Sequence, residues 1–210
     1  PLTSGNGQFL SGQADEYNHF FSSTTTPRCE GALVDSPPHK SSYFHNQLVA
    51  VGKYFEAVSY NHLNYTAKII ANPDNINGYY TVSNEMEYYA TGDALLAEFF
   101  TEALDAAAVD IDEYFDDIDE YFDDETSFSS NDVVFIVFYA GLSQDFSYPT
   151  LDPTIYDLHS AYIDSTMMQK AILQGVDPAE IDGTPVHTGI ILPETYNHIY
   201  YDVIEDIYYG

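Results

Sequence analysis

The feature that most constrains the fold is an apolar run from Val133 to Ala140, eight consecutive residues rich in Val, Phe and Ile. It is bounded by Asn131-Asp132 on one side and by Gly141 on the other. A short run of β-branched and aromatic residues between turn residues is typical of a strand buried on both faces. Such a strand needs cover on each side, so the run predicts a layered α/β domain with this strand near the centre of the sheet.

Periodicity predicts the helices. Apolar residues at positions 44, 48, 51, 54, 55 and 58 predict a helix over residues 42–58, with Ser41 or Ser42 as its N-cap. A broad apolar face predicts a second helix over 94–108. One or two helical turns are expected over 167–173, and a last helix is expected from Thr195 or Asn197 to about residue 207.

Shorter apolar or alternating segments predict the other strands. These segments are Gly31–Asp35, Leu63–Ile70, Ser160–Ile163 and Ile190–Leu192. The turn residues Asn72-Pro73-Asp74-Asn75 end the second of them. Loops are expected over 78–90, where tyrosines would anchor the chain, and over 141–154 and 175–189. Residues 1–30 read as an extended N-terminal segment, and 31–210 as a single α/β domain.

An internal duplication lies between the second helix and the apolar run. The seven residues 111–117 are repeated identically as 118–124. In a helix this repeat has an aromatic face and a carboxylate face. Clustered oxygen ligands suit calcium, which makes Asp116, Asp117, Asp119, Asp123 and Asp124 candidate ligands. The repeat lacks the glycine and the ligand spacing of an EF-hand, and a solvated helix face explains it equally well.

The charge is strongly one-sided. Thirty-four Asp and Glu against five Lys and Arg give a formal net charge of −29. This charge excludes nucleic acid and anionic membrane as natural partners, because both are themselves negative. A cation is the more plausible partner, although the charge also serves solubility. No apolar run is long enough to span a bilayer.

Several features favour export and assembly. The chain begins at Pro1, which suggests a processed product, and we expect an extracellular or cell-surface location. Asn64 begins an Asn-Tyr-Thr sequon and is a candidate glycosylation site. Cys29 is the single cysteine, which excludes an intramolecular disulfide. Twenty tyrosines and no tryptophan favour large or wet interfaces, because tyrosine buries area and keeps a polar tip.

No catalytic motif occurs in the sequence. It has no His-Glu-x-x-His, Gly-x-Ser-x-Gly or Cys-x-x-Cys pattern and no phosphate-binding glycine loop. The seven histidines are scattered, and no two are three or four residues apart. The residues alone therefore predict no catalytic site.

Several segments, taken in order, resemble the catalytic domain of immune-inhibitor-A-like secreted metallopeptidases. They are Gly31–Pro37, Tyr43–Leu63, Glu87–Tyr89, the strand at 132–141, Asp152–Tyr162 and Gly189–Thr195. The resemblance covers about residues 31–196 and implies the upper, mixed-sheet part of a zincin-like α/β domain, an exported origin and calcium as a candidate ligand. In that family the zinc-binding His-Glu-x-x-His helix lies just downstream of the last segment. His198 is no substitute, since Tyr201-Asp202 occupies the positions three and four further on, so no catalytic residue is carried over.

These observations favour a non-catalytic exported protein that uses a metallopeptidase-like scaffold for self-assembly. The expected partners are copies of the same chain, in a homo-oligomer or a filament-like homopolymer joined through the terminal segments. One alternative is the N-terminal part of a secreted zinc metallopeptidase whose zinc helix lies downstream. Another is a calcium-dependent adhesion module.

Overall fold

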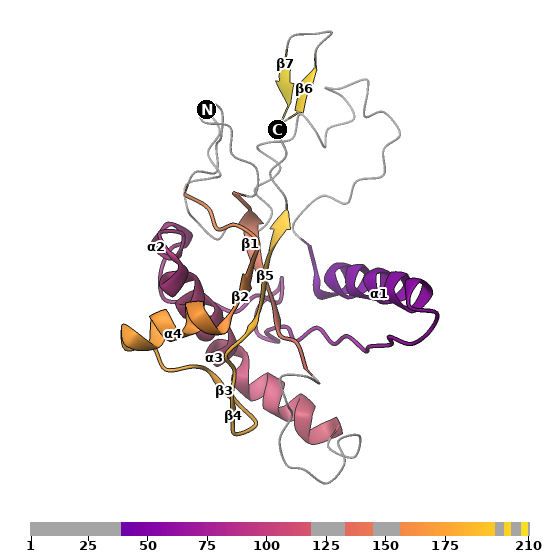
Figure 1. The fold of residues 1–210 in the computed structure, drawn as a ribbon, viewed down its shortest axis with the longest axis horizontal. Helices are drawn as coiled ribbons and strands as arrows, with labels where there is room; N and C mark the ends of the chain where they lie inside the picture. The colour runs from indigo at the N-terminus through magenta and orange to yellow at the C-terminus, as the bar shows by residue number, and fades with distance from the viewer. Residues whose placement is uncertain (1–38, 119–132, 145–155, 196–199, 203–206, 210) are drawn as a thin grey trace.

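The computed structural model describes residues 39–118, 133–144, 156–195, 200–202 and 207–209 (Figure 1). Its centre is a three-stranded sheet in the order β1 (Ile136–Leu142), β5 (Gly189–Thr195), β2 (Ala161–Ile163). β1 runs parallel to β5, whereas β2 runs antiparallel to it. The chain thus combines helices with a small mixed sheet, and the predicted α/β class is confirmed. The predicted strands at 160–163 and 190–192 are both present.

The position predicted for the apolar run is wrong in one respect. β1 begins at Ile136, and among the described strands it is paired on one side only, whereas β5 is paired on both sides. Val133–Phe135 precede the strand, and Val134 is 64% exposed. Residues 135–138 are only partly buried, so the predicted burial on both faces is also wrong for most of the run. A hydrophobic run alone does not give the order of a strand in its sheet. The run also bends at its end, where the register shifts between Tyr139 and Leu142.

The longest helix, α3 (Asp93–Ile118), covers one face of the sheet. The ring of its Phe99 meets the ring of Tyr139 on β1 edge to face, with centroids 6.2 Å apart. The predicted helix at 94–108 is confirmed and continues through the first copy of the repeat. It does so because Ile111 and Phe115, each 5% exposed, extend the same apolar face. The second copy, 118–124, begins at the last residue of α3, and its residues 119–124 lie outside the described residues.

α4 (Ser165–Leu173) confirms the helical turns predicted near 167–173. Its N-cap is Asp164, whose carboxylate accepts the N–H groups of Thr166 and Met167, both at 2.8 Å. The predicted loop at 175–189 instead contains a small hairpin of β3 (Glu180–Ile181) and β4 (Thr184–Pro185). Two-residue strands are too short to show a period, so the sequence pattern does not reveal them.

Of the two remaining helices, α1 (Ser41–Val58) confirms the predicted range, but not the predicted cap. Lys40 is the N-cap, and no side chain caps this end of α1. The short α2 (Met86–Tyr89) lies within the predicted loop at 78–90. The tyrosine anchoring expected there is confirmed, because Tyr89 is fully buried.

The segment Leu63–Ile70 is not a strand among the described residues. Residues 63–66 are all exposed, and Tyr65 folds back so that its hydroxyl donates to the backbone oxygen of Leu48 at 2.7 Å. A segment with alternating hydrophobicity forms a strand only where the edge of a sheet is available for it to pair with. The turn predicted at Asn72–Asn75 is confirmed, and the N–H of Asn72 donates to Gly78 O at 2.9 Å.

The last helix predicted from the sequence is also wrong. β6 (Tyr200–Asp202) and β7 (Ile207–Tyr209) pair antiparallel in that region. Tyr and Ile favour strands, and here this local propensity outweighs the helical spacing. The predicted strand Gly31–Asp35 and the N-terminal segment 1–30 lie outside the described residues.

Candidate functional site

A buried carboxylate marks the carboxyl ends of the parallel strands β1 and β5. Glu194, 5% exposed, accepts the backbone N–H of His39 at 2.7 Å and that of Gly141 at 3.3 Å. The imidazole Nδ1 of His39 lies 3.6 Å from the same carboxylate. Both carboxylate oxygens of Glu194 thus accept hydrogen bonds from backbone N–H groups of the same chain. We call this contact of His39, Gly141 and Glu194 the clamp; it ties the chain entering α1 to the sheet.

Two aromatic contacts extend the clamp into the first turns of α1. The ring of His39 stacks on Tyr43, with centroids 3.8 Å apart. Phe44 is 5% exposed and packs on Phe138 of β1, with centroids 4.6 Å apart. Beyond Phe44, α1 points away from the sheet, on the side opposite α2 and α4 (Figure 1). The first turns of α1 are therefore anchored, whereas the rest of the helix stands apart.

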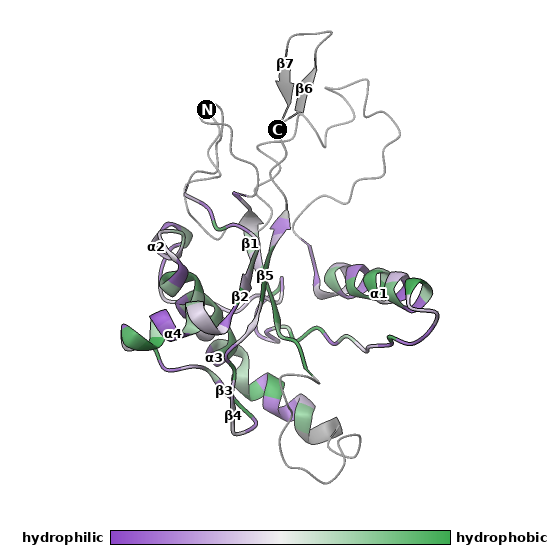
Figure 2. Cartoon of the chain, viewed as in Figure 1, coloured by the Kyte–Doolittle hydropathy of each residue, from purple (hydrophilic) through white to green (hydrophobic). Residues whose placement is uncertain are grey.

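The part of α1 that stands apart exposes apolar side chains. We define the α1 stripe as Leu48, Val51, Phe55 and Val58. The exposed fractions of the last three are 45%, 39% and 52%. Green apolar residues alternate with purple polar ones around α1 in Figure 2, as in an amphipathic helix. An amphipathic helix normally buries its apolar face, so the exposed stripe is a candidate interaction surface.

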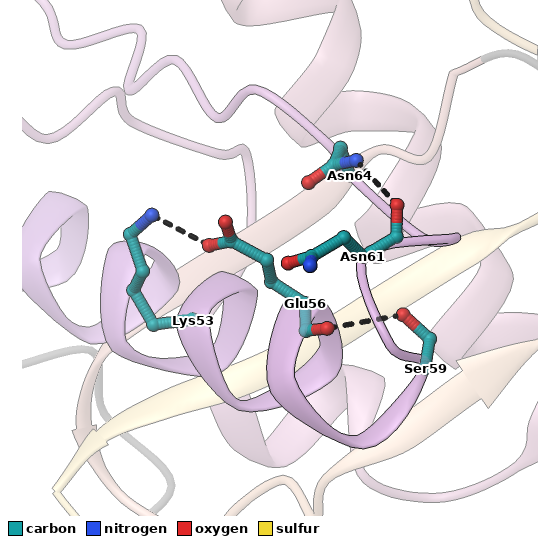
Figure 3. Close-up of polar contacts among 5 residues, drawn as sticks. All are labelled: Lys53, Glu56, Ser59, Asn61 and Asn64. Atoms are coloured by element: carbon teal, nitrogen blue, oxygen red, sulfur yellow. Dashed lines mark hydrogen bonds and ion pairs between the residues drawn. The ribbon is translucent and has the colours of Figure 1, made fainter.

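The end of α1 reverses the chain with local contacts (Figure 3). Tyr60 and Asn61 have φ values of 55° and 64°, in the left-handed region. The N–H of Asn61 donates to Glu56 O at 2.8 Å, which closes the last turn. Lys53 pairs with the Glu56 carboxylate at 2.5 Å one turn before the end of the helix (Figure 3).

The reversed chain then packs against α1 at a glycine. A Cβ on Gly52 would lie 3.3 Å from the ring of Tyr65, so the absence of a side chain lets this ring lie against the helix. The glycosylation candidate Asn64 is exposed in this segment, and its side-chain amide donates to Asn61 O at 3.1 Å. The sequon therefore lies on an accessible turn beside the α1 stripe.

None of the calcium candidates has a side chain among the described residues. Asp116 and Asp117 fall in the last turn of α3, where the structure describes the backbone and not the side chains. Asp119, Asp123 and Asp124 lie outside the described residues. Within the described ranges, no group of three or more His, Cys, Asp or Glu side chains is placed to hold a metal ion. Calcium binding by the repeat stays a prediction.

Tyrosine–carboxylate pairs fasten the chain before α3 to that helix. The hydroxyl of Tyr89 donates to Glu102 at 2.8 Å, and burial together with this bond raises the pKa of Tyr89 to about 12. The hydroxyl of Tyr80 donates to Asp110 at 2.5 Å, and burial raises the pKa of Tyr80 well above its usual value. These pairs give Tyr80 and Tyr89, two of the twenty tyrosines, a structural role.

Carboxylate pKa values shift at two further places on α3. Burial, with a smaller contribution from Glu102, raises the pKa of Asp105. The hydrogen bond from Lys170 lowers the pKa of Asp93, with which it forms an exposed ion pair at 2.5 Å. Both groups lie on the outer part of α3, away from the clamp and the α1 stripe.

The clamp residues were not predicted from the sequence. Glu194 and His39 are 155 positions apart, and neither lies in a catalytic or metal-binding motif. The one available signal is that a Glu follows the apolar residues of β5, where a buried charge needs a partner. Only the folded structure shows that His39 and Gly141 are the partners of Glu194.

Comparison with known proteins finds no matching protein family, no matching curated protein and no matching solved structure. In the part of the chain that the structure describes, no helix has the length and apolar character needed to cross a membrane.

Proposed function

We propose that this chain is a non-catalytic, exported protein that uses a metallopeptidase-like α/β scaffold as a self-assembling subunit. The observation that carries the proposal is the exposed α1 stripe on a helix whose first turns are clamped to the sheet. Anchoring at one end holds the stripe in a fixed direction, which suits a repeated contact better than a loose segment would.

The same surface is nearly free of charge in an acidic protein. Lys53 and Glu56 are the only formally charged residues of α1, which therefore has no net charge, whereas the chain carries −29. Copies approaching through α1 avoid the like-charge repulsion that other surfaces impose. The high tyrosine content supports the same function, because tyrosine suits extensive interfaces.

Electron microscopy and light scattering of the purified chain test this proposal, at low and moderate salt, with and without calcium. Regular assemblies that persist or grow as salt screens the charge would support it. A monodisperse monomer under every condition would refute it.

The sheet favours a second candidate, the sheet-bearing part of a secreted zinc metallopeptidase. The parallel pair β1–β5 flanked by antiparallel β2, with α3 on one face, has the mixed character that the sequence resemblance implies. The test is to read the gene beyond the codon for Gly210. A continuation into a His-Glu-x-x-His helix would favour the enzyme, whereas a stop codon there would exclude it.

A further inference from the structure

We propose that the partner of the α1 stripe is the α1 helix of a second copy, so that two chains pair through these helices. This inference rests on the proposed self-assembly and identifies the surface through which it begins. It follows from the spacing of the stripe, the charge of its flanks and the anchoring of the helix.

The spacing is that of a helix pair. Val49 and Tyr54, which are 44% and 62% exposed, lie beside a row of apolar residues that starts at Phe44. The row continues at positions 48, 51, 55 and 58, so its steps alternate between four and three residues. This alternation places all of them along one seam of a helix, as in the a and d positions of a heptad. Such a seam matches another helix crossing at a shallow angle. The matching partner is therefore a helix with the same spacing, which a second copy supplies.

The seam begins buried and becomes exposed. Phe44, its first residue, is fixed on Phe138, whereas Val51, Phe55 and Val58 are 39–52% exposed. Tyr65 partly covers Leu48, through its bond to the Leu48 backbone and its packing beside Gly52. The pairing surface is thus the second half of α1, about three turns from Leu48 to Val58.

The flanks of the seam carry no formal charge with His neutral. The positions on either side of it are His45, Gln47, Gly52 and Tyr54. Lys53 and Glu56 pair with each other on the outer part of the helix. Two α1 helices therefore meet without like charges opposite one another. By contrast, α3 carries many carboxylates and would repel a second α3.

A concentration series in sedimentation velocity tests this pairing, with the complete chain as the sample. The wild type should show a reversible monomer–dimer step. The variant Val51→Ser/Phe55→Ser should raise the dissociation constant of that step at least about tenfold. The matched control Val109→Ser changes a valine that is 80% exposed on α3 and should leave the step unchanged. Far-UV circular dichroism would confirm that each variant is folded.

A second variant tests the uncharged flank without removing apolar surface. Gln47→Glu places like charges beside the seam of a paired helix, so the dimer of this variant should be weaker at low salt. Its stability should recover as added salt screens the charges. Gln169→Glu, an exposed position on α4, is the control and should not weaken it.

Two outcomes would overturn the inference. If assemblies form but the Val51→Ser/Phe55→Ser variant forms them equally well, the pairing surface is wrong while the proposed self-assembly stands. If the wild type stays monomeric at every concentration and salt, both are refuted.

Discussion

A helix packs closely on the sheet at Gly189, the first residue of the central strand β5, and this contact leads to a prediction about stability. A Cβ added at Gly189 would lie 2.8 Å from the backbone oxygen of Phe135 and would also run into the ring of Phe100, which is fully buried. We expect Gly189→Ala to destabilise the fold strongly, because no free space accommodates the methyl group.

The magnitude follows from which groups would have to move. The Phe135 oxygen accepts the N–H of Ile190 at 2.9 Å, and Gly189 pairs with Ile163 on the other side. Relieving the clash by a backbone shift weakens this pairing, and moving the Phe100 ring disturbs the core. Overpacking costs about 1–3 kcal/mol, and a weakened buried hydrogen bond adds about 1 kcal/mol. We therefore expect a loss of about 2–4 kcal/mol in the free energy of unfolding.

Urea denaturation followed by tyrosine fluorescence and circular dichroism would measure this loss. The control is Gly92→Ala, because a Cβ there meets no atom within 4 Å. The control should change the stability by no more than about 1 kcal/mol. If Gly189→Ala proves as stable as the control, the packing of α3 against β5 described above is wrong.

Three other perturbations have defined outcomes. Glu194→Ala leaves the N–H groups of His39 and Gly141 buried without their acceptor, so denaturation should show a loss of about 2–4 kcal/mol in the free energy of unfolding. The same change at the exposed Glu113 is the control and should cost little. Equal losses for the two variants would contradict the clamp. The pKa of Tyr89 is about 12 in the folded chain and ordinarily 10, so the neutral hydroxyl is favoured by folding. This stabilisation is present below pH 10 and lost as the pH rises towards 12. Ultraviolet titration of the native protein should show a tyrosine that ionises at higher pH than the others, and Tyr89→Phe should remove this step. A titration curve that Tyr89→Phe leaves unchanged would contradict the raised pKa of Tyr89. Finally, if the acidic repeat binds calcium, a chelator should lower the melting temperature of calcium-loaded protein, and an unchanged melting temperature would exclude that site.

Local patterns in the sequence predicted local structure well. α1 and α3 follow from apolar residues three and four positions apart, because this period reflects a property of the helix itself. The strands Ala161–Ile163 and Gly189–Thr195 were also found from short apolar segments. The repeat at 111–117 continues α3 because Ile111 and Phe115 keep the same face.

Features that depend on distant partners could not be predicted. The strand order puts β5 in the centre, since it pairs with strands from two other parts of the chain, and no local pattern encodes this choice. Leu63–Ile70 alternates like a strand, yet Tyr65 bonds to α1 and residues 63–66 remain exposed. The clamp depends on Glu194 meeting His39, which neither sequence segment reveals alone.

The distribution of charge determines how the proposed pairing should respond to salt. A chain at −29 disfavours association through most of its surface, and this repulsion weakens as the Debye length falls from about 30 Å at 10 mM salt to about 3 Å at 1 M. A contact made through the uncharged α1 stripe keeps its apolar gain while losing that general repulsion, so added sodium chloride should strengthen it. An association held by ion pairs, or by calcium bridging the acidic repeat, should weaken under the same change. The direction of the salt dependence therefore distinguishes helix pairing from carboxylate-mediated contacts, before any residue is changed.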